Sequence, residues 1–341
     1  MNIIAQHLGP DVNRFSGKTI LITGAAGFLG RHFIEFFRDL NKNYLHEPCT
    51  VLAVDNYITG AVPLEAGYGI TPLWADVTQP LPLRAPVHFI ISAAGIASPV
   101  YYRTFPLETI DATVAGTRNM LELARKQESL EAFLYFSSSE IYGDPYNGVI
   151  PTSEDFNGNV SCTGPRACYD ESKRLGETLC SIYKEKFTVP VKVVRPFNVF
   201  GPGMSHADRR VVPMYTLEAL HGRPLPIFLG GTQTRTFCYI TDAMVGFLKV
   251  LLNGHYGEAY NIGNQDNEIA MRDLGAMFQK LILGTELSFV PYPDAYPSSE
   301  PLRRCPDISK AREHLGYWPT VSLKEGLAAF IAWARNDLGY L

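Results

Sequence analysis

Short apolar segments recur along the first half of the chain, and stretches with helical periodicity lie between them. In 107–127, apolar side chains return every three or four residues, which predicts a helix with one buried face. The same spacing predicts a helix over 169–187. Alternating strands and helices are typical of a parallel sheet with helices on both faces. The predicted strands are 18–24, 50–55, 69–75, 87–94, 132–138 and 190–198.

The pattern changes after Arg195, where prolines and glycines divide the chain into shorter pieces. We therefore expect a doubly wound α/β domain over 18–195, joined by part of 237–265, and a smaller C-terminal lobe, mainly 196–341, that closes on a substrate. Residues 1–17 show little pattern and are expected to form a mobile extension. Helices are predicted in the C-terminal half over 241–253, 270–282, 307–315 and 323–336.

The first strand leads directly into a glycine-rich turn, Gly24-Ala25-Ala26-Gly27-Phe28-Leu29-Gly30, and then into a helical stretch, 31–40. Such glycines permit a tight turn and close approach of a pyrophosphate to the N–H groups that open a helix. The spacing is G-x-x-G-x-x-G, whereas the common dinucleotide-binding pattern is G-x-G-x-x-G. The second strand ends in Asp55, whose carboxylate can accept hydrogen bonds from both ribose hydroxyls. Asn56 and Tyr57 follow without a cation for a 2′-phosphate, which favours NAD over NADP.

Tyr169 and Lys173 are four residues apart, so they lie on one face of the helix predicted over 169–187. A neighbouring ammonium favours the phenolate, and we expect Lys173 to lower the pKa of Tyr169. The phenolate is a base able to take a proton from an alcohol. Hydroxyl groups of the segment 137–143, Ser-Ser-Ser-Glu-Ile-Tyr-Gly, are placed to hold the same substrate oxygen. Together with a hydride acceptor, these groups are suited to oxidising an alcohol.

Composition excludes several other classes of protein. The chain has 341 residues, 19% of them charged, and a net charge of −4, so no basic field indicates a nucleic-acid partner. No apolar stretch approaches the ~20 residues of a membrane span, and the first residues do not resemble a secretory signal. Six cysteines without a C-x-x-C pair indicate free thiols in the cytoplasm. The scattered histidines lack metal-ligand spacing, so no metal is expected.

Several motifs in order, over roughly 18–336, resemble the extended short-chain dehydrogenase/reductases, the NAD-dependent nucleotide-sugar epimerase/dehydratase family. The resemblance implies a Rossmann-type parallel sheet with a C-terminal lobe that binds a nucleotide sugar. It also implies a homodimer in which helices 107–127 and 169–187 form a four-helix bundle with a second copy. The motifs are 23–30, Asp76-Val77, 137–143, Tyr169-x-x-x-Lys173 and Arg195-Pro196-Phe197-Asn198-Val199-Phe200-Gly201-Pro202.

Within this family the chain is most similar to the UDP-glucuronate decarboxylases, which form UDP-xylose. The similarity lies in 97–99, 138–145, 164–171, 231–237 and Arg304 before Pro306-Asp307. Ser139-Glu140 after the catalytic hydroxyl is the decarboxylase pattern, whereas 4,6-dehydratases usually have Asp-Glu there. The chain departs from the family in having Ser138 for the usual Thr and Gly203 for a usual Arg, and in 91–96 and the loop 146–163. These departures bear on sugar specificity more than on chemistry.

The resemblance implies a redox-neutral cycle on a retained NAD. Tyr169 takes the proton of the sugar 4-hydroxyl while Ser138 holds the oxygen, and the resulting β-keto acid loses carbon dioxide. Arg304 binds the C5 carboxylate through a bidentate interaction. Ser139 and Glu140 lie where a proton relay is needed. The implied NAD contacts are Gly24, Ala26, Gly27, Phe28, Leu29, Asp55, Asn56, Asp76, Val77, Ala93, Ala94, Tyr169 and Lys173. The implied UDP-sugar contacts are Ser98, Pro99, Tyr102, Asn198, Arg210, Val211, Phe228, Arg235 and Arg304.

Each assignment has a structural alternative. Glu140 could bind backbone N–H groups of its own loop, and Arg304 could pair at the surface with Glu300 or Asp307. Asp76 could cap a turn, Phe228 could be a core residue instead of a uracil platform, and Arg235 could form a surface salt bridge. The alternative activities are a nucleotide-sugar 4,6-dehydratase or 4-epimerase and, from another class, a non-catalytic NAD-binding regulator. Retention of Ser138, Tyr169 and Lys173 together argues against the regulator.

Overall fold

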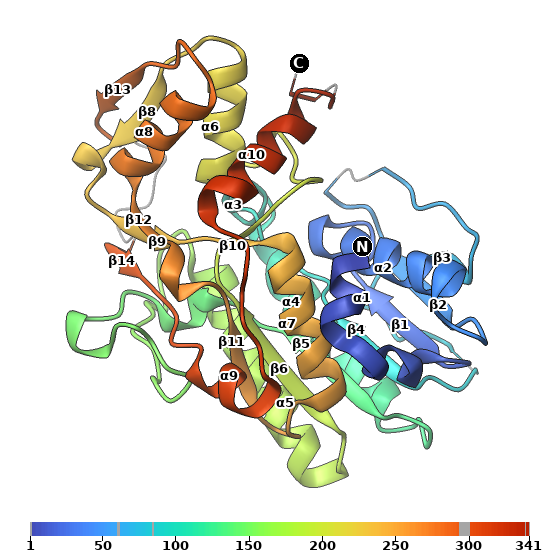
Figure 1. Ribbon diagram of the computed structural model, residues 1–341. Helices are drawn as coiled ribbons and strands as arrows, with labels where there is room; N and C mark the ends of the chain where they lie inside the picture. Colours follow the sequence, from blue (N-terminus) through green and yellow to red (C-terminus); the bar gives the residue numbers. More distant parts are fainter. Residues whose placement is uncertain (1, 60–61, 84, 293–300, 338, 341) are drawn as a thin grey trace.

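A computed structural model describes residues 2–59, 62–83, 85–292, 301–337 and 339–340 (Figure 1). Its centre is a seven-stranded sheet in the order β11-β6-β5-β4-β1-β2-β3, in which all neighbouring strands are parallel. All six strands predicted in the first half of the chain belong to it, which confirms the parallel α/β fold. The strands are β1 (Thr19–Thr23), β2 (Thr50–Asp55), β3 (Ile70–Trp74), β4 (Phe89–Ser92), β5 (Ala132–Phe136), β6 (Val191–Pro196) and β11 (Ala259–Ile262).

Alternate side chains of each strand pack into two separate cores, one on each face of the sheet. From β1, Ile20 and Ile22 point to one face and Leu21 to the other. The first face is covered by α2, α7 and α9, and the second by α4 and α5, which pack along each other. These helices are α2 (Phe28–Asn43), α4 (Pro106–Ala124), α5 (Ala167–Phe187), α7 (Ile240–Asn253) and α9 (Ser309–Leu315).

The N-terminal segment is part of the first core. Residues Asn2–Leu8 form α1 and Gly9–Phe15 form a 3-10 helix, η1. Ile4, Leu8 and Phe15 are buried, and the Phe15 ring lies 5.1 Å from the Phe37 ring and 5.3 Å from the Phe89 ring. The expectation of a mobile extension was wrong for these residues, because the segment is too short for its apolar positions to reveal a period but still covers α7.

The sheet order creates a crevice at the carboxyl ends of β1 and β4. From β1 the chain proceeds outward through β2 and β3, and it then returns to β4 on the other side of β1. Ligands of doubly wound sheets bind where the strand order reverses in this way. The glycine-rich turn follows β1, and Ala93 and Ala94 follow β4, so both segments lie at this crevice.

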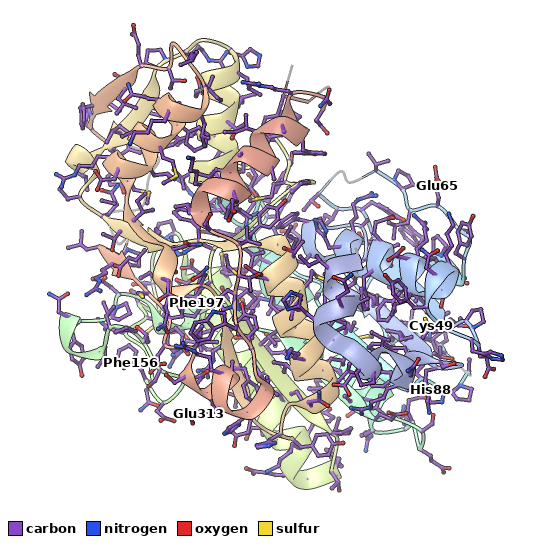
Figure 2. The ribbon with its side chains drawn as sticks, in the orientation of Figure 1. Cys49, Glu65, His88, Phe156, Phe197 and Glu313 are labelled. Atoms are coloured by element: carbon purple, nitrogen blue, oxygen red, sulfur yellow. The ribbon has the colours of Figure 1, made fainter. Side chains whose placement is uncertain are left out.

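The C-terminal half forms a second lobe with its own core of side chains such as Ile227, Phe278 and Phe330. Phe197, fully buried against Ile141 and Tyr142, lies in the middle of the molecule in Figure 2. The predicted helices 270–282 and 323–336 are α8 and α10. Further elements are α3 (Pro99–Thr104), η2 (Ser139–Tyr142), η3 (Asn147–Val149), β7 (Val199–Phe200), α6 (Val211–Leu220), β8 (Leu225–Phe228), η4 (Leu229–Gly231), β9 (Thr234–Thr236), β10 (Cys238–Tyr239), η5 (Gln265–Asn267), β12 (Glu268–Ala270), α8 (Met271–Leu281), β13 (Leu287–Val290), β14 (Arg303–Arg304) and α10 (Leu323–Ala334).

Within the described ranges, no helix has the combination of length and apolar character that crossing a membrane requires.

Candidate active site

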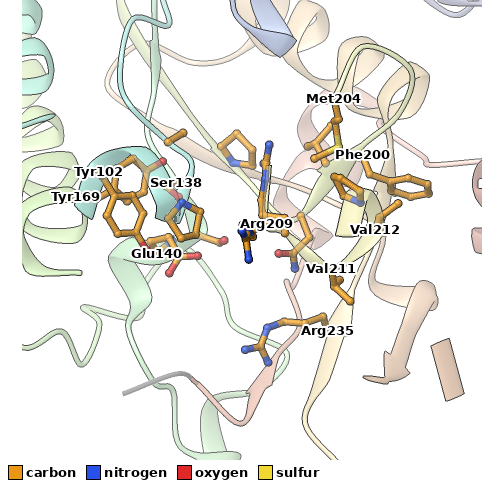
Figure 3. Close-up of a pocket in the computed structure, with 18 of the residues that line it drawn as sticks. Tyr102, Ser138, Glu140, Tyr169, Phe200, Met204, Arg209, Val211, Val212 and Arg235 are labelled. Carbon is orange, nitrogen blue, oxygen red and sulfur yellow. Dashed lines mark hydrogen bonds between the residues drawn. The ribbon is translucent and has the colours of Figure 1, made fainter. Parts of the chain in front are cut away.

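A cavity of about 820 Å³ lies between the two lobes. Ser138, Glu140 and Tyr169 form one wall, and Arg209, Val211 and Val212 face them from the other lobe (Figure 3). The first wall comes from the turn after β5 and from the start of α5, whereas the opposite wall comes from the start of α6 and the loop before it. The cavity therefore collects predicted catalytic and substrate-binding residues from segments far apart in the sequence.

The turn after β5 presents the three predicted residues Ser138, Ser139 and Glu140. Ser138 is the N-cap of η2, and its hydroxyl accepts a hydrogen bond from the Glu140 N–H at 3.2 Å. This bond fixes the start of the 3-10 turn, as expected for a serine at an N-cap. All three residues line the cavity, and Ser138 also shares a side-chain hydrogen bond with Tyr169. The hydroxyl and the phenol thus face the same point in the cavity.

Helix α5 places Tyr169 and Lys173 on one face, as predicted. The Lys173 ammonium donates to the Phe136 carbonyl at 2.8 Å and lies 5.8 Å from the centre of the Tyr169 ring. Tyr102, a predicted substrate contact, lines the cavity and stacks on Tyr169 with ring centres 5.4 Å apart. Tyr169 is therefore held on several sides.

The expected lowering of the Tyr169 pKa was wrong for the protein by itself. Burial raises the pKa of Tyr169 to about 12, although the hydrogen bond from Ser138 opposes this. Burial also lowers the pKa of Lys173 to about 8. Removing charged forms from water outweighs the attraction that the spacing of the two residues predicted.

Glu140 lies between two arginines, Arg304 and Arg166. Arg304 donates from both terminal nitrogens to the two Glu140 oxygens, at 2.5 and 2.9 Å, and Arg166 forms an ion pair with Glu140 from the start of α5. Burial raises the pKa of Glu140, but the charges of Arg166 and Arg304 outweigh burial and lower the pKa to about 2. Glu140 therefore carries a full negative charge at neutral pH.

This geometry shows which partners Glu140 and Arg304 have in place of those considered from the sequence. Arg304 is almost fully buried and pairs with Glu140, not with Asp307; Glu300 lies outside the described residues. We expected Arg304 to form a bidentate interaction with a substrate carboxylate, but it forms one with Glu140. Of the five guanidinium N–H groups, two are used by Glu140, and three remain.

The predicted cofactor residues lie along the crevice, and their geometry fits a dinucleotide. Gly24 has φ 69°, and a Cβ atom there would lie 2.8 Å from the Ala93 carbonyl oxygen. At Gly30 a Cβ atom would overlap the Gly24 carbonyl, so the helix can approach the strand only with glycine. Gly27 is the N-cap of α2, whose first N–H groups, including those of Phe28 and Leu29, face phosphate at such turns.

Two carboxylates flank this crevice. Asp55, at the end of β2, accepts from the N–H groups of Ala26 (2.9 Å) and Tyr57 (2.7 Å). Each oxygen has a second lone pair for a ribose hydroxyl. Asp76 accepts from the Thr78 N–H at 2.9 Å, so it does cap a turn. Asn56 follows β2, Val77 packs beside α4, and the Ala94 N–H donates to the Thr23 hydroxyl.

The predicted nucleotide contacts lie mostly on the second lobe. Phe228 stacks on Tyr292 with ring centres 5.1 Å apart, and both line the cavity, so Phe228 is not a core residue. Arg235 is buried on β9 and lines the cavity in the same region. Pro99, Asn198, Arg210 and Val211 line it as well, whereas Ser98 is buried just before α3.

Several lining residues were not selected from the sequence. Arg166 was noted only as part of a motif, and Arg209 and Tyr292 were not considered. Asp170, next to Tyr169, lies within the ion-pair cluster, 3.5 Å from the Arg166 Nε. Asp170 belongs to the motif 164–171 noted in the sequence, but its burial and its partners depend on turns that only the fold brings together. Among the described residues, no three His, Cys, Asp or Glu side chains are grouped as a metal site.

The chain is similar to known proteins over most of its length. The sequence pattern of the NAD dependent epimerase/dehydratase family matches residues 20–263. UDP-glucuronic acid decarboxylase 6 of Arabidopsis thaliana is 39% identical over 330 residues, covering 95% of this chain and 91% of that protein. UDP-glucuronic acid decarboxylase 1 of Xenopus tropicalis is 38% identical over 325 residues, covering 94% of this chain and 73% of that protein.

Solved structures of related enzymes share the fold. A UDP-glucuronic acid 4-epimerase variant from Bacillus cereus, in complex with a fluorinated UDP-glucuronic acid and NAD, superposes with a TM-score of 0.77 at 27% identity and covers 93% of this chain and 99% of that one. A dTDP-glucose 4,6-dehydratase from Streptomyces venezuelae with NAD bound gives a TM-score of 0.80 at 24% identity, with 94% and 98% covered. The second likeness concerns the fold alone.

Proposed function

Because the chain belongs to the NAD dependent epimerase/dehydratase family, we propose that it uses NAD to decarboxylate UDP-glucuronate to UDP-xylose through a 4-keto intermediate. The observation that carries this proposal is the position of Glu140, Arg166 and Arg304 in the same cavity as Tyr169. Oxidation of a hydroxyl needs only the tyrosine side of this arrangement. Two buried arginines beside it suit a substrate that carries a carboxylate.

On the tyrosine side, the residues move one proton and hold one oxygen. NAD, when bound in the crevice, supplies the acceptor and later the donor of a hydride. Ser138 hydrogen-bonds Tyr169, so the two groups are placed to bind the same 4-hydroxyl oxygen. Tyr169 removes the hydroxyl proton and later returns it, and Lys173 supplies positive charge on the same face of α5. Oxidation and the later reduction together leave C4 of the sugar at its original oxidation state.

On the arginine side, the residues bind and orient the C5 carboxylate. A 4-ketone makes the sugar a β-keto acid, so the C5–C6 bond can break with its electron pair delocalised into the ketone. The Arg304 and Arg166 guanidinium groups, both paired with Glu140, supply positive charge for the carboxylate. Ser139 is buried in η2 next to Glu140 and lines the same cavity.

The nucleotide is held by the second lobe in this proposal. Phe228 with Tyr292 offers aromatic faces to uracil, and Arg235, Arg210 and Arg209 offer positive charge to the diphosphate. Asn198 and Tyr102 line the space between this region and Tyr169, where the sugar would lie.

The proposed assembly is a homodimer in which α4 and α5 form a four-helix bundle with a second copy. These helices expose apolar side chains, including Leu107, Ile110, Leu175 and Ile182. Light scattering at micromolar concentration should give the mass of a dimer, and a monomer would contradict the assembly. We place the protein in the cytoplasm, which its six free cysteines support.

The activity is tested by mass spectrometry of products from UDP-glucuronate, UDP-glucose and dTDP-glucose. We expect UDP-glucuronate alone to react and to lose the mass of carbon dioxide. Loss of water from UDP-glucose or dTDP-glucose would instead indicate a dehydratase. Unchanged mass with altered chromatographic mobility would indicate an epimerase, and NAD binding without turnover would indicate a regulator.

A further inference from the structure

A second cavity of about 90 Å³ lies behind the arginines of the active site. Arg166 and Arg304 line both this space and the main cavity, so they form the wall between the two. On its other side the second cavity reaches exposed residues of the loop between η3 and α5, such as Asn159 and Thr163. It therefore lies between the charged cluster and solvent.

Asp170 lines this second cavity and has an unsatisfied side-chain atom. Its side chain is buried, and its Oδ2 lies 3.5 Å from the Arg166 Nε. Among the described residues, its Oδ1 has no hydrogen-bond partner, and the same holds for the buried Nε of Arg304. Buried polar atoms are almost always satisfied, and a polar cavity of this size has room for water. Two residues that each hold an unsatisfied buried atom therefore line a space that can hold water.

The proposed reaction requires a proton from outside. When the C5–C6 bond breaks, carbon dioxide leaves and its former bonding electron pair remains in the sugar, so C5 must gain a proton. The proton that Tyr169 removes from the 4-hydroxyl returns to that oxygen in the final reduction. The C5 proton is thus additional, and each turnover consumes one proton from solvent.

We infer that Asp170 is the group that takes up this proton when the substrate carboxylate binds, and that the second cavity connects it with solvent. The inference rests on the proposed function. With Asp170 ionised, Glu140, Arg166, Arg304 and Asp170 sum to zero charge, and the site has no net attraction for a carboxylate. With Asp170 neutral the cluster is cationic and complements the carboxylate.

The surroundings of Asp170 favour its neutral form. Burial and then the charge of Glu140 raise the pKa of Asp170 to about 7, while Arg166 and Arg304 oppose this increase. The groups that face it are Glu140 from η2, Arg166 at the N-cap of α5, Cys168 and Tyr169 from α5, Arg304 from β14, and Asp144 across the second cavity. A further negative charge on the substrate would raise the pKa of Asp170 again.

Asp170 releases its proton when the negative charge of the substrate carboxylate is lost. Once carbon dioxide has left, the negative charge of the carboxylate is gone from the site, and the cationic cluster favours ionisation of Asp170. Asp170 then gives up its proton as C5 gains one, which forms the new C–H bond with the electron pair left by the broken C5–C6 bond. Asp170 is a proton-holding residue and does not touch the sugar.

Proton uptake on binding tests this inference. The Tyr169→Phe protein loaded with NAD binds substrate without turnover, and calorimetry in buffers of different ionisation enthalpy counts the protons taken up. At pH about 8, UDP-glucuronate should take up close to one proton per site, and UDP-xylose, which lacks only the carboxylate, should take up none. Above that pH the affinity for UDP-glucuronate should fall roughly tenfold per pH unit.

Two variants in the same background assign the uptake. Asp170→Asn should bind UDP-glucuronate without taking up a proton, whereas Glu171→Gln, on the exposed side of α5, should behave as the parent. If Asp170→Asn fails to fold, Asp170→Glu should shift the pH at which uptake is half complete. Uptake that persists unchanged in the Asp170 variants, or UDP-glucuronate binding without uptake, would overturn this inference alone. UDP-glucuronate binding no tighter than UDP-glucose would overturn the proposed function as well.

Discussion

The cofactor crevice and the arginine wall of the cavity are built in different ways. The crevice consists of backbone and small side chains that follow β1, β2 and β4, and its essential feature is space, as at Gly24 and Gly30. The arginine wall consists of charged side chains from η2, α5 and β14, with Arg304 and Glu140 164 residues apart in the sequence. One region is shaped by local geometry, and the other by charges that must be balanced against each other.

This difference predicts different consequences of substitution. Changes in the crevice alter which dinucleotide fits, because they change shape or a single hydrogen bond. Changes in the arginine wall leave a buried charge without its partner, which strongly destabilises the folded protein. Tyr169 lies between the two regions, because the cavity that it lines also includes Ala93 of the crevice and Glu140 of the arginine wall.

The largest effect is expected where the two regions meet. Tyr169→Phe removes the base for the 4-hydroxyl, so turnover should fall roughly 10²–10⁴-fold. The crevice is unchanged, and NAD should still bind with normal affinity, as fluorescence titration can measure. Normal turnover by this variant would show that another group serves as the base.

Arg304→Ala tests the arginine wall by itself. Carbon dioxide release from UDP-glucuronate should fall by roughly 10²-fold or more, since a charged donor at the reacting group is lost. Glu140→Gln should act in the same direction, and NAD binding should persist in both variants. The matched control is Arg303→Ala, because Arg303 is adjacent in β14 but pairs with Glu268.

The two arginine-wall variants and the control also separate the activities considered. If Arg304→Ala and Glu140→Gln both released carbon dioxide at the unmodified rate, the decarboxylase assignment of this wall would be wrong. An equal loss in Arg303→Ala would mean that the effect comes from disturbing β14 and not from the site.

Asp170 should make stability depend on pH. Its folded-state pKa is raised from 3.8 to about 7, so between these values the folded protein binds a proton that the unfolded chain does not. Stability linked to Asp170 therefore falls as pH rises through this window. In urea unfolding, the stability of Asp170→Asn relative to the parent should increase by on the order of 4 kcal/mol as the pH rises from 4 to 8. A pH-independent difference would contradict the raised pKa.

The smallest of these effects concerns the crevice. Asp55→Ala removes the carboxylate expected on the adenosine ribose, so the preference for NAD over NADP should fall by roughly tenfold, the value of one or two charged hydrogen bonds. Asp39→Ala, on the surface of α2, should leave the preference unchanged. Equal binding of both cofactors by the unmodified protein would refute the role of Asp55.

The features that could be predicted from the sequence are mostly those set by local geometry, as in the crevice. The six strands, the glycine turn and the Tyr169–Lys173 helix were predictable, because each depends on residues close in the chain. The helical N-terminal segment, residues 2–15, was missed because its packing depends on α7, more than 200 residues away. The pKa of Tyr169 was predicted with the wrong sign, since spacing reports a neighbouring charge but not the degree of burial.

The arginine wall shows the limit most clearly. Glu140 and Arg304 were selected from a resemblance, but their mutual ion pair was not predicted. Arg166 and Asp170 take their roles from the charges around them, and these charges come from three separate elements. No local pattern contains that information.

The central claim, decarboxylation with recycled NAD, is tested most directly with UDP-glucuronate labelled by a heavy carbon isotope at the carboxyl carbon. Nuclear magnetic resonance would follow the label while the protein holds only its bound NAD and none is added. We predict that the label appears in carbon dioxide and bicarbonate, with one UDP-xylose formed for each labelled carbon released and many turnovers per bound NAD. Label that stays in the sugar, or release that stops after one turnover, would contradict the account.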